Sequence, residues 1–113
     1  MEIHLHEETG FSTLRITGDV DASSSIHLDS MIASMIQQGK YRIHADMSGV
    51  NYISSAGMGV FISFMDELKA SGGAFVLSGL QAPVKEVFEL LGLHQIIPMV
   101  STAEEAAKMF QHA

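Results

Sequence analysis

The chain has 113 residues, of which 47% are hydrophobic, and its formal net charge is −7. This length suffices for one compact domain with a hydrophobic core, so we expect a single domain over 1–113. The acidic charge and the six dispersed Lys and Arg argue against nucleic-acid binding, and the absence of Cys excludes a disulfide framework and a thiolate metal site.

The first residues carry no basic segment and no long apolar run, so we expect no signal peptide. No window approaches the run of about 18 apolar residues that a membrane span requires, so we expect no membrane insertion. A cytoplasmic protein is therefore the expectation.

Alternating apolar and polar residues predict two strands at the start of the chain, around 3–5 and 13–17, which form a hairpin. Asp21 is a candidate N-cap for a helix over about 22–38, whose apolar residues recur with helical spacing. Gly39 is expected to end that helix.

A third strand is predicted over 41–47, followed by a short polar loop and a second helix that 71–73 breaks. The run 74–78 is short and apolar, as in a strand buried on both faces. The loop after Asp46 is expected at the carboxyl end of its strand, where α/β folds tend to place functional residues.

Pro83 fits the first turn of a third helix, with four apolar side chains expected to point inward: Val84, Val87, Phe88 and Leu91. A last short strand is expected within 93–99, and a capping box at 101–104 starts a final helix. The alternation of strands and helices predicts an α/β fold with a mixed sheet of four to five strands and four helices, in which only the first strand is antiparallel.

Ser54 and Ser55 stand where the second helix is expected to begin, and two interpretations are open. A serine there caps the helix, or it carries a phosphate, which the helix dipole favours at that end. A nucleophile elbow would need Gly where Ile53 stands. The segment 57–59 lacks the other residues of a phosphate-binding loop, so close packing is the better interpretation of its two glycines.

His4 and His6 lie on one face of the first strand, but a third metal ligand is not evident, so solvent exposure is the favoured interpretation. Asp19, Asp21 and Asp46 allow a carboxylate pair or an Mg²⁺ site, while capping and local hydrogen bonding explain Asp21 and Asp46 equally well. We therefore expect no metal, no cofactor and no enzyme activity.

Five segments together resemble the STAS domain family over nearly the whole chain. They are Gly18–Asp21, Asp46–Val50, Tyr52–Gly59, Gly79–Leu80 and Val84–Leu93. At this size the chain is similar to bacterial anti-sigma factor antagonists. The resemblance implies a binding partner that is both anti-sigma factor and serine kinase of the histidine-kinase-like ATPase type. It also implies a serine phosphatase of the PP2C type that resets the switch.

By the same resemblance Ser55 is the phosphoacceptor, and Asp21 and Asp46 are acidic residues near it. Ser54 stands where many family members have Asp, which makes it the second candidate for phosphorylation. The expected partner-binding residues are Asp21, Ser23, Asp46, Ser54, Ser55, Ala56, Gly57 and Met58. The alternative that the family allows is an interaction module that docks a transport or stress-signalling complex without phosphorylation.

Overall fold

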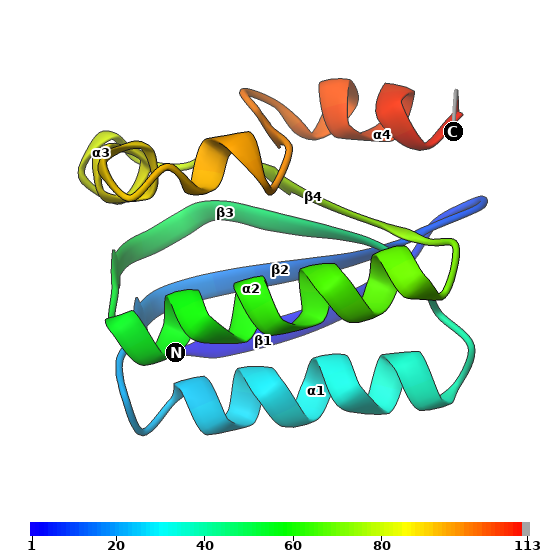
Figure 1. Ribbon diagram of the computed structural model, residues 1–113, viewed down its shortest axis with the longest axis horizontal. Helices are drawn as coiled ribbons and strands as arrows, with labels where there is room; N and C mark the ends of the chain where they lie inside the picture. The colour runs from blue at the N-terminus through cyan, green and yellow to red at the C-terminus, as the bar shows by residue number, and fades with distance from the viewer. Residues whose placement is uncertain (112–113) are drawn as a thin grey trace.

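The computed structural model describes residues 1–111, which form one five-stranded sheet and four α-helices. The sheet order is β1-β2-β3-β4-β5, and only β1 is antiparallel to its neighbour (Figure 1). The predicted mixed α/β sheet is confirmed. The strands are β1 (Glu2–Glu7), β2 (Ser12–Val20), β3 (Arg42–Ile53), β4 (Ala74–Ser78) and β5 (Met99–Val100). The α-helices are α1 (Ser25–Gln37), α2 (Ser55–Ala70), α3 (Ala82–Leu90) and α4 (Ala103–Gln111).

The sheet separates two hydrophobic clusters. The larger lies between the sheet and helices α1, α2 and α3, where Phe61 of α2 packs against Phe75 of β4 and Phe88 of α3. The smaller lies under α4, where Phe110 meets Val76 of β4. Because side chains alternate along a strand, β4 supplies both clusters and is buried on both faces, as predicted.

Helix α1 begins three residues later than predicted. Residues 22–24 form a turn, the helix starts at Ser25, and Ser24 rather than Asp21 occupies the N-cap position. The predicted end is confirmed: Gly39 adopts φ +82°, and the following N–H, that of Lys40, bonds to the carbonyl of Met35 at 2.9 Å.

Strand β3 continues to Ile53, so the polar loop predicted after Met47 is wrong. Its second half pairs with β2 in parallel across two register shifts, and β2 ends where β3 ends, at Val20 opposite Ile53. Gly49 lies within this paired stretch and permits a close approach to β2, since an added Cβ would lie 2.6 Å from Thr17 Cγ2. Pairing with β2 outweighs the weak strand propensity of these polar residues.

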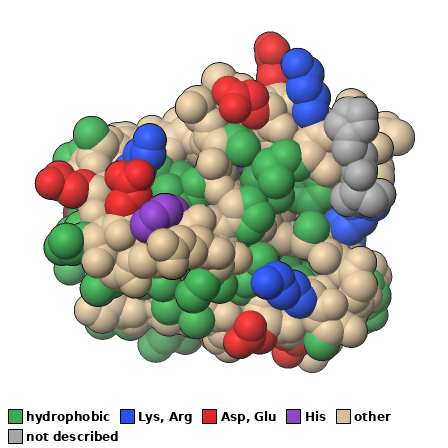
Figure 2. Space-filling model, turned by 45° about the horizontal axis from the view of Figure 1, so that its top comes forward, with side chains coloured by type: hydrophobic (Ala, Val, Ile, Leu, Met, Phe, Trp, Pro, Cys, Tyr) green, Lys and Arg blue, Asp and Glu red, His purple; other side chains and the backbone are tan. Residues whose placement is uncertain are grey.

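The last third of the chain needs three smaller corrections. Val84 and Phe88 of α3 are buried, while Val87 and the C-cap residue Leu91 are exposed. Figure 2 shows that hydrophobic side chains also reach the surface of the protein. The last strand, β5, follows Pro98 instead of preceding it, and Leu93–Gln95 form a 3₁₀ turn. The final helix is capped from Thr102, whose Oγ1 accepts the N–H of Glu105 at 3.1 Å, and not from Ser101.

Candidate functional site

Ser54 caps helix α2 and fastens it to the sheet. Its Oγ accepts the backbone N–H of Gly57 at 3.1 Å, and its own N–H donates to the carbonyl of Val20 at 2.8 Å. Ser54 has an extended backbone, as an N-cap residue does. The capping interpretation therefore holds for Ser54, and its hydroxyl is already engaged.

Ser55 is the first residue of α2 and is exposed. Within residues 1–111 its hydroxyl takes part in no hydrogen bond, and the first turn of α2 contains no Asp or Glu. The helix N-terminus carries a partial positive charge, which favours an anion at this position. The Ser55 hydroxyl is thus accessible and lies where a phosphate is electrostatically tolerated.

Gly57 lets the first turn of α2 approach the strand ends. An added Cβ would lie 2.8 Å from Val20 Cγ1 and 2.9 Å from Ile53 Cγ1. Gly59 has open space around it. The packing interpretation of this segment therefore holds for Gly57 alone. Met58, the next residue of the helix, is also buried.

Asp21 organises the turn before α1, directly after the end of β2. Its Oδ1 accepts the N–H of Ser24 at 2.8 Å, the hydroxyl of Ser24 at 3.0 Å and that of Ser23 at 3.0 Å. The hydrogen bonds from Ser24, and then that from Ser23, lower the pKa of Asp21. The carboxylate is exposed. Asp21 follows Val20 and Ser55 follows Ser54, and Val20 and Ser54 are joined by a hydrogen bond. Asp21 and Ser55 therefore lie at the same end of the sheet, where β2 and β3 finish.

Asp46 lies away from that end of the sheet. It is seven residues before Ile53 on β3, which at about 3.3 Å per residue is on the order of 20 Å. Its Oδ1 accepts the N–H and hydroxyl of Ser48 at 3.0 and 2.7 Å, and Oδ2 pairs with Arg15 Nε at 3.5 Å. The expectation that Asp46 is near Ser55 is therefore wrong for this chain.

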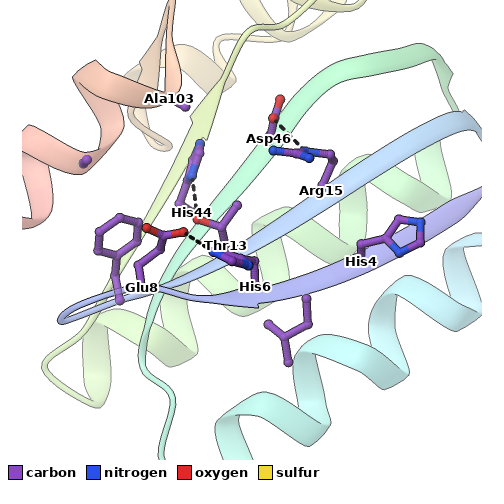
Figure 3. Close-up of a pocket in the computed structure, with 11 residues that line it drawn as sticks. His4, His6, Glu8, Thr13, Arg15, His44, Asp46 and Ala103 are labelled. Atoms are coloured by element: carbon purple, nitrogen blue, oxygen red, sulfur yellow. Dashed lines mark hydrogen bonds and ion pairs between the residues drawn. The ribbon is translucent and has the colours of Figure 1, made fainter.

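The environment of Asp46 is a cleft of about 380 Å³ between the sheet and α4 (Figure 3). Burial raises the pKa of Asp46, but the two hydrogen bonds from Ser48, with Arg15 and His44, outweigh it and the pKa is lowered. Its neighbours therefore hold the carboxylate ionised. These contacts give Asp46 a local structural role.

His44 is a polar core residue that the sequence did not single out. It is 2% exposed, with Nδ1 3.1 Å from Thr13 Oγ1 and Nε2 2.6 Å from Ser78 Oγ. Burial lowers its pKa, and the nearby carboxylates of Asp46 and Glu8 offset this only in part. The one signal in the sequence is a polar residue in each of three neighbouring buried strands.

His4 and His6 are exposed on β1, as predicted, and each pairs with a carboxylate, His4 with Glu2 and His6 with Glu8. Among residues 1–111 no three His, Asp or Glu side chains are grouped so that they could hold a metal ion. Asp19 lies at the end of β2, exposed to solvent. In the same described range, none of the helices has the length and apolar character needed to cross a membrane.

The sequence of the chain matches the model of a known domain family. The model of the STAS domain matches residues 2–106. The chain belongs to the STAS domain family. The resemblance seen in the sequence is thereby confirmed for the family and for its fold.

Among STAS relatives, the chain is 30% identical over 113 residues to BtrV of Bordetella bronchiseptica, assigned as an anti-sigma factor antagonist, with 100% of this chain and 97% of BtrV covered. A Thermotoga maritima protein with the same assignment has a TM-score of 0.92 at 20% identity, covering 96% and 94%. SpoIIAA of Bacillus, a cell fate determinant solved in its phosphorylated form, has a TM-score of 0.76 at 24% identity, covering 96% and 98%. These two structures show the shared fold.

Proposed function

We propose that this STAS domain is an anti-sigma factor antagonist of a partner-switching pathway, and that Ser55 is its switch. Unphosphorylated, it binds an anti-sigma factor that is also a serine kinase of the histidine-kinase-like ATPase type. Phosphorylation releases it, and a PP2C-type phosphatase resets it. It acts in the cytoplasm as a binding protein with no cofactor, and 1–113 work as one domain, of which 112–113 lie outside the described residues.

The observation that carries the proposal is that Ser54 caps α2 while the neighbouring Ser55 is exposed. Ser54 Oγ is bonded to the N–H of Gly57, while Ser55 is exposed and its hydroxyl makes no hydrogen bond within residues 1–111. In phosphoryl transfer the Ser55 Oγ–P bond would form as the bond from the γ-phosphorus to ADP breaks, and the kinase would accept the hydroxyl proton. The same reaction at Ser54 would take place on a half-buried residue, at the oxygen that caps α2.

Charge is what changes at Ser55, while the fold is expected to stay the same. A phosphoserine adds about −1.5 to −2 charge at neutral pH. The N-terminus of α2 favours such a charge by about 0.3–1 kcal/mol, and the first turn holds no carboxylate to repel it. The domain therefore tolerates the phosphate, and the cost falls on the partner interface.

The exposed residues beside Ser55 supply the proposed contact surface. Three of them are exposed at the same end of the sheet: Asp21, Ser23 and Ala56. Gly57 and Met58 are buried and would act by holding the helix in place. A new charge against a complementary surface costs several kcal/mol if it is unpaired. A loss of about 3–4 kcal/mol weakens binding by two to three orders of magnitude, which is enough for a switch.

The test is incubation with ATP and the cognate kinase, followed by mass spectrometry of the peptide that holds both serines. We expect one phosphate, on Ser55, and none in Ser55→Ala. Ser54→Ala is the matched variant, since it removes the neighbouring hydroxyl and should still be phosphorylated. A phosphate on Ser54, or kinase binding that is equally tight for Ser55→Asp, would contradict the proposal.

The same experiment addresses the alternative function. If the kinase binds the chain but transfers no phosphate to either serine, the domain is a docking module and the switch proposal is wrong. Pull-down of a transport or scaffold complex that Ser55→Asp does not weaken would have the same meaning.

A further inference from the structure

Strand β1 leaves a long, unpaired edge on the sheet. It is the outermost strand, and within residues 1–111 its only ladder partner is β2. The opposite edge is blunted, because β5 has two residues and follows Pro98. β1 has six residues, pairs with β2 without a register shift, and contains none of the Pro, Lys or bulges that commonly protect an edge strand.

The apolar side of the sheet also continues to this edge. A groove of about 560 Å³ runs between β1 and α1, lined by Met1, Ile3 and Met31 together with the polar residues Ser24, His27, Ser30 and Ser34. Leu5, on the same side of β1, is 39% exposed, and Met1 is 36% exposed. The core is therefore open at β1, where a further strand would close it.

We propose that a second copy of this chain closes the edge, with the two β1 strands antiparallel about a two-fold axis at His4. Opposite residues then share a face of the joined sheet. Glu2 of each copy faces His6 of the other, Ile3 faces Leu5, and His4 faces itself. The occupant is argued from this self-complementarity: a carboxylate meets an imidazole N–H, and apolar meets apolar, twice each.

The side chains at the edge are exposed, and in the single chain they form exposed ion pairs, which a second copy can replace at little cost. The side chains of Glu2, His4 and His6 are 77%, 70% and 76% exposed. His4 and His6 lie on the face of β1 opposite α1, along the cleft that leads to Arg15 (Figure 3). Glu2 is 3.5 Å from His4 of its own chain, so it already lies beside the proposed axis.

Neighbouring registers fit less well. A shift of the axis to Leu5 places Ile3 opposite the carboxylate of Glu7. A shift to Ile3 keeps apolar and charged residues matched but pairs only three residues of β1, against five for the axis at His4. An axis between two residues would place opposite side chains on different faces of the sheet.

Sedimentation velocity of the full chain, from about 1 µM to about 1 mM, tests the dimer. A residue on the axis meets its own copy, so His4→Glu and His4→Lys should both weaken the dimer by about fivefold or more, while His4→Gln keeps it. Glu2→Lys and His6→Glu should each weaken it, and the double variant should restore it. Circular dichroism checks that every variant is folded.

A cysteine test reports the register directly, because the chain has no Cys of its own. In His4→Cys the two thiols face each other with Cα atoms about 4.5–5.5 Å apart, within disulfide range, so mild oxidation should link the copies. Glu2→Cys is the matched control, since its two copies lie about 14 Å apart and should stay unlinked. Glu2→Cys with His6→Cys should link.

Three results would overturn the proposal: a monomer at every concentration, a dimer that His4→Glu and His4→Lys leave unchanged, or a Glu2→Cys variant that links as readily as His4→Cys. Because phosphorylation of Ser55 is not involved, failure of the switch and failure of the dimer are separate outcomes.

Discussion

The N–H of Ser54 donates a hydrogen bond to the carbonyl oxygen of Val20, so the first residue after β3 is fastened to the last residue of β2. This bond places the start of α2 beside the turn that Asp21 organises. The exposed hydroxyl of Ser55 and the exposed carboxylate of Asp21 therefore lie at the same end of the sheet, where β2 and β3 finish.

The two serines should differ in their effect on stability. Ser54→Ala removes the cap of α2 and should lower the free energy of unfolding by about 1 kcal/mol. Ser55→Ala removes a hydroxyl without a partner and should change it by less than about 0.5 kcal/mol. Urea denaturation of the two variants beside the parent chain measures both. Equal losses would mean that the hydroxyl of Ser55 also supports the helix.

The two glycines of α2 form a second matched pair. Gly59→Ala meets open space in a helix and should stabilise the protein by about 0.5–1 kcal/mol. Gly57→Ala gains the same helix propensity, but its Cβ would overlap Val20 and Ile53, so a net loss of about 1–3 kcal/mol is expected. Thermal unfolding gives the sign of each change. A stabilised Gly57→Ala would show that α2 can move away from the strand ends.

His44 should make stability depend on pH in the neutral range. Burial lowers its pKa in the folded protein below the ordinary 6.5, so the unfolded chain binds more protons there. Stability is then highest above about pH 6.5 and falls as pH decreases below that value. The carboxylates with lowered pKa, Glu7, Asp21 and Asp46, titrate at lower pH and have little effect in this range.

The measurement for His44 is the urea midpoint between pH 7.5 and 5.5. The midpoint of the parent chain should fall, and His44→Gln should show a lower midpoint at pH 7.5 but a flatter profile. The glutamine keeps a donor and an acceptor for Thr13 and Ser78 without the titration. A profile equally steep in the variant would assign the pH dependence to other groups.

The family resemblance implies two aspartates near Ser55, and substitutions of the two should have different effects on stability and on kinase binding. Asp46→Asn removes the ion pair with Arg15 and the charged acceptor for the hydroxyl of Ser48. It should therefore lower the free energy of unfolding by about 1 kcal/mol and leave phosphorylation by the kinase unchanged. Asp21→Asn changes an exposed carboxylate at the proposed contact surface, so it should weaken binding of the kinase. Kinase binding and phosphorylation rates of both variants decide this, and a defect in Asp46→Asn that exceeds its stability loss would contradict it.

Much of the fold could be predicted because its signals are local. The apolar stripe and the glycine stop of α1, the alternation in β1 and β2, and the apolar run of β4 each lie within a few residues of one another. Val87 and Leu91 were placed inward because they continue the apolar stripe of α3, but that helix buries only Val84 and Phe88. A stripe in the sequence gives the possible width of a buried face, and the neighbours decide how much of it is covered.

By itself, the sequence determined the order of the elements, the family, and the position of two serines at the start of a helix. Only the tertiary structure decided that Ser54 is the cap and Ser55 is free, that β3 continues through 48–53, and that Asp46 faces Arg15 and not the serines. The physical reason is that β2 and β3 pair through residues more than thirty positions apart in the chain, and this pairing extends β3, joins Ser54 to Val20 and sets Arg15 beside Asp46. Local propensities do not contain such pairings.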